Sequence, residues 1–149
     1  MAAKHTCCVY LGDELARYAF GDDHPFGPLR HDAFRNALYN KSLDRQVDVL
    51  NPVMTTHDVL ELFHERDYIR KVKHMSKLGS GFLDQGDTPA FIGMYEAVLT
   101  VAGTVCNAID RVINNEYKRA FIPIAGLHHA RRHIAAGFCV VNDCGIAIE

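Results

Sequence analysis

The feature that most constrains the fold of this chain is an alternation of short apolar runs with longer segments of helical periodicity. We interpret three apolar runs as strands: His5–Leu11, Val47–Leu50 and Ala120–Ile124. Strands that alternate with helices form mostly parallel sheets, because each helix carries the chain back across the sheet. The sequence therefore predicts an α/β fold of three layers, α/β/α, with helices on both faces of a mostly parallel sheet.

Four segments place apolar residues at helical spacing and are predicted helices: 32–44, 55–63, 65–78 and 89–113. Thr55 and Asp58 have the spacing of a capping box, in which two side chains satisfy free amides at a helix start. Thr88 and Pro89 predict an N-cap followed by a first helical position. Two segments rich in glycine or proline are predicted loops: 21–30 and 78–88.

The predicted helix over residues 89–113 is apolar around most of its circumference. This pattern is typical of a membrane span, and also of a helix buried in a protein core. Glu96 and Asn107 interrupt the apolar surface. We therefore favour a buried helix and expect no membrane partner.

Composition limits the partners that we expect. The formal net charge is -2, which gives no general attraction to nucleic acid. The predicted helix 65–78 has a basic face that would suit either a phosphate backbone or water, and the net charge favours water. The five cysteines are odd in number and form no CxxC pair, which indicates reduced thiols. With no apolar segment of signal-peptide length at the start, we expect a cytoplasmic protein.

The end of the sequence interrupts a predicted element. Asn142 and Asp143 resemble a helix cap, and the apolar helix that they begin stops at Glu149. A helix this short is marginal by itself. We therefore expect residues 1–149 to be a piece of a longer fold, with no domain boundary inside it.

Two adjacent imidazoles, His128 and His129, follow the third predicted strand, and a glycine turn over 136–139 comes soon after. Open α/β sheets place their chemistry at the carboxyl ends of strands. The pKa of histidine suits proton transfer near neutral pH. The pair is therefore a candidate general acid and base. The alternative is a pair of structural histidines, which is how we interpret His24 and His64.

The sequence around these histidines resembles a known signature. Gly126–Ala130, followed by Ala136–Asp143, is similar to the active-site signature of the histone deacetylase superfamily, especially its acetoin-utilization and deacetylase-like members in bacteria and archaea. Other segments resemble further parts of the same family: 21–30, 49–69 and 86–95. The resemblance thus covers nearly all of the chain.

The resemblance implies a fold related to arginase and a zinc-dependent amidohydrolase, in which a metal-bound water attacks the carbonyl of an acylated amine. It implies that His128 acts electrostatically or as a proton donor and that His129 is the general base and then the acid. The backbone carbonyl of Gly137 would bind the substrate amide. Phe138 would form one wall of the acyl-amine channel.

Two further roles follow from the resemblance. Asp87 would lie at the rim and hold the substrate backbone, and Arg30 would line an internal cavity behind the metal. A structural role is also open to three of these residues. Asp87 would also suit the cap of the helix predicted from Pro89, Phe138 would suit a core, and Arg30 would suit an exposed surface.

The resemblance places the family's metal ligands, an Asp-x-His pair and a later Asp, beyond the residue that matches Glu149. We therefore expect zinc in the full-length family and no zinc bound by this chain alone. One hypothesis is the N-terminal part of a deacetylase-like hydrolase acting on an acetyl-lysine or acetylpolyamine type of substrate. The other is a non-catalytic interaction or regulatory module. In both cases an open sheet edge predicts self-association.

Overall fold

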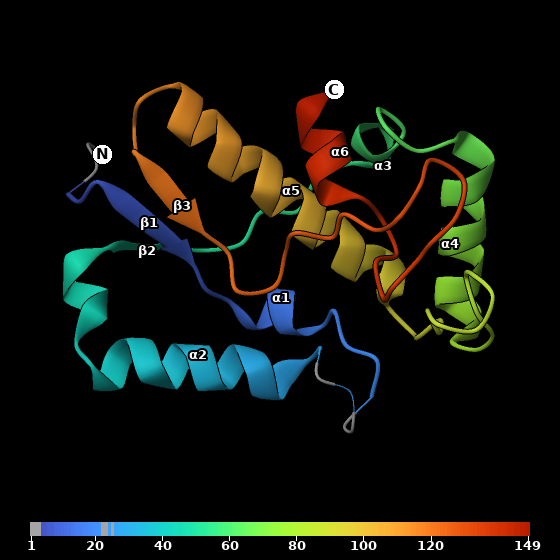
Figure 1. Cartoon of the computed structure of the whole chain (residues 1–149), viewed down its shortest axis with the longest axis horizontal. Coiled ribbons are helices and arrows are strands. Elements are labelled where there is room, and N and C mark those ends of the chain that lie inside the picture. Colours follow the sequence, from blue (N-terminus) through green and yellow to red (C-terminus); the bar gives the residue numbers. More distant parts are fainter. Residues whose placement is uncertain (1–3, 22–23, 25) are drawn as a thin grey trace.

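The computed structural model describes residues 4–21, 24 and 26–149. Its elements follow one another in this order: β1 (Cys7–Tyr10), α1 (Asp13–Ala16), α2 (Pro28–Asn40), the 3₁₀ helix η1 (Leu43–Gln46), β2 (Asp48–Leu50), α3 (His57–Leu60), α4 (Arg66–Leu78), α5 (Met94–Ile113), β3 (Arg119–Phe121) and α6 (Asp143–Ile148). Figure 1 shows α5 on one side of the strands and α2 on the other. The predicted alternation of strands and helices is therefore present.

The three strands form one parallel sheet in the order β2-β1-β3. Val9 in the central strand is paired with Val49 in β2 and with Phe121 in β3. The prediction of a mostly parallel sheet is confirmed. Each strand is shorter than the apolar run that predicted it, because the ends of those runs continue into loops.

Helices cover both faces of the sheet because successive residues of a strand point to opposite sides. Cys8 and Tyr10 of β1 belong to the large core that includes α5. Val9 and Leu11 belong to a smaller cluster with Leu38 of α2. The predicted α/β/α layering is confirmed.

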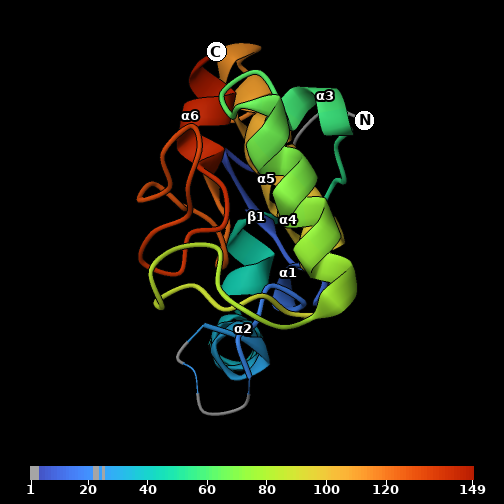
Figure 2. The same ribbon diagram turned by 90° about the vertical axis from the view of Figure 1, so that its right-hand side faces the viewer.

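Helix α5 is the buried helix that the sequence predicts, and Figure 2 shows α4 packed beside it. Gly103 allows the backbone of residues 53–55 to approach closely, since a Cβ there would lie 2.4 Å from the carbonyl oxygen of Val53. The hydroxyl of Thr104 accepts the N–H of Val53 at 3.0 Å. Within the described part of the chain, no helix combines the length and hydropathy that a membrane crossing requires.

Two predicted helix starts are wrong. Helix α5 begins at Met94 and not at Pro89, and its N-cap is Gly93 with a φ of 79°. Thr88 is instead buried in the preceding loop, where its hydroxyl bonds to Asp84. The capping box at Thr55 is also absent: α3 begins at His57, and its start has no side-chain cap among the described residues.

Other boundaries differ less. Helix α2 begins four residues before the prediction, at Pro28, because proline suits the first turn of a helix. Helix α4 follows Glu65 as predicted. The predicted cap of α6 is confirmed, since Asn142 Oδ1 accepts the N–H of Gly145 at 2.7 Å.

Candidate functional site

The tandem histidines lie in the segment after β3, where the chain leaves the carboxyl edge of the sheet. Both side chains are exposed, and their ring centroids are 4.3 Å apart. His128 Nδ1 lies 2.8 Å from the carbonyl oxygen of Gly126. Because a carbonyl only accepts, Nδ1 carries the proton in this contact, which leaves Nε2 of His128 to meet a substrate.

Two buried tyrosines hold the segment that follows the histidines. The hydroxyl of Tyr18 donates to the carbonyl oxygen of Phe138 at 2.6 Å and accepts the N–H of Val140 at 2.9 Å. The hydroxyl of Tyr68 donates to the carbonyl oxygen of Val140 at 2.5 Å. Burial raises the pKa of Tyr18 well above its usual value, so the phenol remains a donor.

A loop before α5 supports the same segment. The hydroxyl of Thr88 accepts the N–H of Phe138 at 3.2 Å and donates to Asp84 Oδ2 at 2.6 Å. Burial by itself would raise the pKa of Asp84, but hydrogen bonds from Thr88, Asp87 and Gly86 hold that pKa below its usual value. Asp84 therefore stays ionised as the anchor of this loop.

The start of α6 closes the segment. The buried carboxylate of Asp143 accepts the N–H of Gly126 at 2.9 Å and that of Leu127 at 3.1 Å. Burial raises the pKa of Asp143 above its usual value even though these N–H groups favour the charged form. The backbone just before the tandem histidines is thus fixed by a side chain that follows them.

Gly137 lies against His129. A Cβ on Gly137 would lie 3.3 Å from the imidazole ring of His129, and the φ of Gly137 is 53°. A larger residue would therefore meet the ring and also strain the backbone. Glycine allows the turn to approach the second histidine closely.

Phe138 is partly buried and belongs to an aromatic group. Its ring centroid lies 4.3 Å from that of His24 and 5.9 Å from that of Phe20. Phe138 also has a positive φ, 64°, which is uncommon for a phenylalanine and is held by the bonds from Tyr18 and Thr88. The strained backbone places this aromatic ring directly after Gly137.

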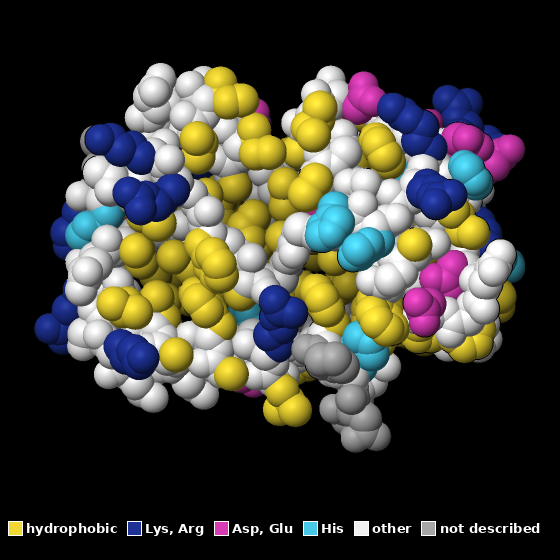
Figure 3. Space-filling view, viewed as in Figure 1, with side chains coloured by type: hydrophobic (Ala, Val, Ile, Leu, Met, Phe, Trp, Pro, Cys, Tyr) yellow, Lys and Arg dark blue, Asp and Glu magenta, His cyan; other side chains and the backbone are white. Residues whose placement is uncertain are grey.

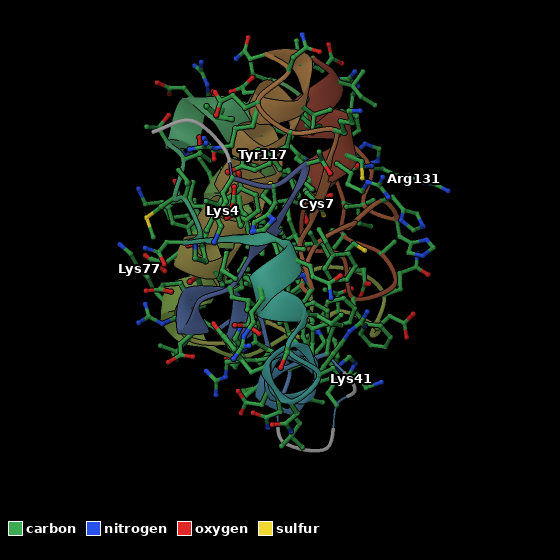
Figure 4. All side chains as sticks on the ribbon, turned by 90° about the vertical axis from the view of Figure 1, so that its left-hand side faces the viewer. Lys4, Cys7, Lys41, Lys77, Tyr117 and Arg131 are labelled. Atoms are coloured by element: carbon green, nitrogen blue, oxygen red, sulfur yellow. The ribbon has the colours of Figure 1, made fainter. Side chains whose placement is uncertain are left out.

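Asp87 and Gly137 line one cleft. The cleft has a volume of about 530 Å³, and Arg131 also contributes to its wall. Asp87 is exposed, and since α5 begins at Met94, it does not cap that helix. Arg131 is exposed and projects outward (Figure 4). The structure thus brings the predicted rim residue and Gly137 together.

Arg30 is placed differently. It is exposed on α2, and its guanidinium carbon lies 5.0 Å from the ring centroid of Phe26. It lines neither the Asp87 cleft nor any of the other described pockets. Arg30 ends the segment 21–30, which resembles a part of the family's sequence. Residues 22, 23 and 25 of this segment lie outside the described residues.

The described residues do not fit a zinc ion. A structural or catalytic zinc needs at least three protein ligands. No group of three or more His, Cys, Asp or Glu side chains in the described part of the chain would hold a metal. The sequence Asp22-Asp23-His24 has the Asp-x-His spacing, but its two aspartates lie outside the described residues.

Several supporting residues carry no local sequence signal for the contacts that they make with this segment. Tyr18, Tyr68 and Thr88 reach the histidine segment from distant parts of the chain. His64, which the sequence suggested as a loop-stabilising residue, accepts the N–H of Asn142 at 2.8 Å. The one signal in the sequence is that these polar residues have apolar neighbours along the chain. Such neighbours indicate burial, and a buried polar group needs a hydrogen-bond partner.

Comparison with known proteins gives a consistent result. The histone deacetylase domain family matches residues 24–149. The chain is 31% identical to "Histone deacetylase HDAC1" of Drosophila melanogaster over 98% of this chain and 30% of that protein. It is 30% identical to "Acetoin utilization protein AcuC" of Staphylococcus aureus over 99% of this chain and 39% of that protein. The chain thus spans about a third of the length of these relatives.

A solved structure has a similar fold. The crystal structure of the HDA15 HD domain superposes with a TM-score of 0.82 and covers 97% of this chain and 43% of the HDA15 chain. The sequence identity in that comparison is 21%, so it supports the fold alone. The parallel sheet with helices on both faces is therefore the architecture of that domain over the shared region.

Proposed function

This chain belongs to the histone deacetylase family, and we propose that residues 1–149 are the N-terminal portion of a single domain that hydrolyses an acylated amine. The observation that carries the proposal is the exposed pair His128 and His129 at the carboxyl edge of the sheet, with the Gly137 turn packed against His129. A pair of groups that can transfer protons suits amide hydrolysis.

Each candidate residue has a role in this proposal. His129 takes a proton from the attacking water and returns a proton to the leaving amine. His128, whose Nδ1–H is held by Gly126, stabilises the charge that develops on the substrate. The carbonyl of Gly137 accepts the N–H of the substrate amide. The ring of Phe138, packed among aromatic neighbours, contacts the methylene chain.

The substrate class is an acylated primary amine of the acetyl-lysine or acetylpolyamine type. In that case Asp87, exposed at the mouth of the cleft beside Gly137, would accept hydrogen bonds from the substrate backbone or amines. Arg30 is proposed to face an internal cavity that further parts of the domain would complete. These assignments follow the family resemblance.

The whole protein is proposed to need zinc, bound by residues outside this sequence. The chain by itself is then proposed to be inactive, because its described residues offer no group of three metal ligands. The five cysteines are all free thiols. Free thiols fit a reducing compartment such as the cytoplasm.

Substitution of His129 by Ala in the longer protein that carries this sequence tests the catalytic role. We expect deacetylation of an acetyl-lysine peptide or an acetylated polyamine to fall about 100- to 10,000-fold, which is the usual contribution of a general acid or base. His133→Ala is the matched control, since His133 is exposed in the same segment and its closest acidic contact, Glu65, is at 3.8 Å. Retained activity in His129→Ala would remove the proposed role.

The second candidate function is a non-catalytic interaction module. It is favoured by an apolar groove of about 570 Å³ between α5 and β3, which includes Ile113 and Phe121 and is visible as a hydrophobic hollow in Figure 3. β3 pairs only with β1 among the described strands. We propose that a second copy of the 149-residue chain pairs with this edge. Light scattering across a concentration series tests this, and a monomer at all concentrations would contradict it.

A further inference from the structure

Asn142 links the histidine segment to α6 through every polar group of its side chain. Its Oδ1 accepts the N–H of Gly145 at 2.7 Å and so caps α6. Its Nδ2 donates to the carbonyl oxygen of His128 at 3.2 Å and to that of Ala130 at 2.9 Å. The helix cap fixes which side-chain atom is the oxygen, so the two remaining contacts are donor contacts to carbonyls.

The two carbonyl groups lie on either side of His129 in the chain. The peptide bond before His129 and the one after Ala130 are therefore both held by one amide. The imidazole of His129 is exposed, its neighbours are the His128 ring and the Gly137 turn, and among the described residues no side chain forms a hydrogen bond with it. The position of the ring follows largely from the backbone that carries it.

His64 supports Asn142 from the other side. Its Nε2 accepts the backbone N–H of Asn142 at 2.8 Å, and its Nδ1 faces the carbonyl oxygen of Arg132 at 3.3 Å. The donor and the acceptor fix a neutral ring with the proton on Nδ1. Burial lowers the pKa of His64 to about 4, so the ring keeps this state at neutral pH.

We propose that Asn142, held by His64, is a positioning residue that fixes the backbone on both sides of His129 and thereby orients its imidazole. This inference rests on the proposed function where it concerns catalysis, and it adds to that function the residue that aligns the general base. The contacts with Gly126, Leu127 and Gly137 fix other parts of the segment. Among the described residues, Asn142 is the one that bonds to the carbonyl oxygens of His128 and Ala130.

The substitution Asn142→Asp separates the helix cap from the contacts with the carbonyls of His128 and Ala130. A carboxylate still accepts the N–H of Gly145, and its negative charge suits the start of a helix. It has no proton for the carbonyl oxygens of His128 and Ala130. The cap is therefore retained while the hold on the histidine segment is lost.

Asn115→Asp is the matched control. Asn115 is exposed, and its Nδ2 has a single long contact of 3.4 Å with the carbonyl oxygen of Ile113. Its φ of 59° is one that aspartate also accepts. The control makes the same chemical change and adds the same charge at a position that does not touch the site.

The first measurement uses the 149-residue chain and NMR spectra of its histidine rings. We expect Asn142→Asp to shift the ring resonances of His129, while the amide of Gly145 stays protected from exchange. Asn115→Asp should change neither. An unchanged His129 ring with α6 intact would overturn the proposal. If Asn142→Asp does not fold, Asn142→Ser keeps a capping oxygen without the added charge and is read in the same way.

The second measurement uses the longer protein and its deacetylase activity. We expect Asn142→Asp to lower kcat about 10- to 100-fold with little change in KM, since a misaligned group slows the chemical step. Equal kcat in Asn142→Asp and Asn115→Asp would overturn the proposal. If the unmodified protein has no activity but the NMR change is present, the proposed function fails while the positioning role stands.

Discussion

Two neighbouring regions of this molecule are built in opposite ways. The segment from Gly126 to Asn142 is an irregular loop, and side chains from distant parts of the chain bond to its backbone. The groove between α5 and β3 is regular in its backbone, but it is apolar and open. Phe121 there is 48% exposed and Ile113 is 70% exposed.

The contrast separates a segment that this chain orders by its own contacts from a surface that it leaves open. A buried carbonyl or N–H without a partner costs free energy, so a loop whose backbone groups bond to buried side chains is stabilised in its position. An open edge strand beside an apolar groove is instead a surface that proteins normally cover. Residues of this chain therefore hold the backbone around the tandem histidines in place. The edge of β3 that is free among the described strands can pair with another strand.

Acid should destabilise the folded chain through His64. His64 has a pKa of about 4 in the folded chain, against 6.5 for an ordinary histidine. Between these values the unfolded chain binds a proton that the folded chain does not, so the free energy of unfolding falls as the pH falls. The contribution is complete above about pH 6.5, and about 3 kcal/mol is lost by pH 4. Urea unfolding of the 149-residue chain at several pH values measures it.

His64→Gln is the control for this pH dependence, because glutamine offers an amide and does not titrate. We expect the variant to be less stable at pH 7 and to show a flatter change in the free energy of unfolding between pH 4 and 6.5. Equal slopes in the two proteins would show that the contacts of His64 with Asn142 and Arg132 do not control acid stability.

The sequence predicted those features of the fold that depend on local pattern. The strand around Val9, the helix after Glu65 and the cap at Asn142 were all predicted correctly. Each is encoded within a few residues, by β-branched runs, by helical spacing or by a capping side chain.

The prediction failed where tertiary contacts override a local signal. Thr88 and Pro89 have the pattern of a helix start, yet the hydroxyl of Thr88 bonds to Asp84 and to the backbone of Phe138. Those contacts keep the chain irregular until Gly93, where a positive φ starts α5. No local pattern links Tyr18 to Val140, so the support of the site could not be read from the sequence.

Removal of one hydroxyl tests how far the histidine segment depends on distant side chains. Tyr18→Phe leaves the carbonyl of Phe138 and the N–H of Val140 without their buried partner. We expect the free energy of unfolding to fall by about 2 kcal/mol. Tyr39→Phe is the control, since Tyr39 is 49% exposed and should change stability by less than about 0.5 kcal/mol. Equal effects of the two substitutions would show that the hydrogen bonds of Tyr18 do not stabilise the histidine segment.

A charge placed in the groove between α5 and β3 should change the association of the chain and should change its folding stability little. Phe121→Glu places a charge at the edge strand, and we expect self-association of the 149-residue chain to weaken at least about tenfold, which corresponds to ~1.4 kcal/mol. Phe82→Glu is the matched control, because Phe82 is 50% exposed, against 48% for Phe121, and lies outside the groove. Sedimentation equilibrium measures both variants. If Phe82→Glu weakens association as much as Phe121→Glu, the contact is not at β3. If neither variant has an effect, the groove between α5 and β3 is not where two copies meet.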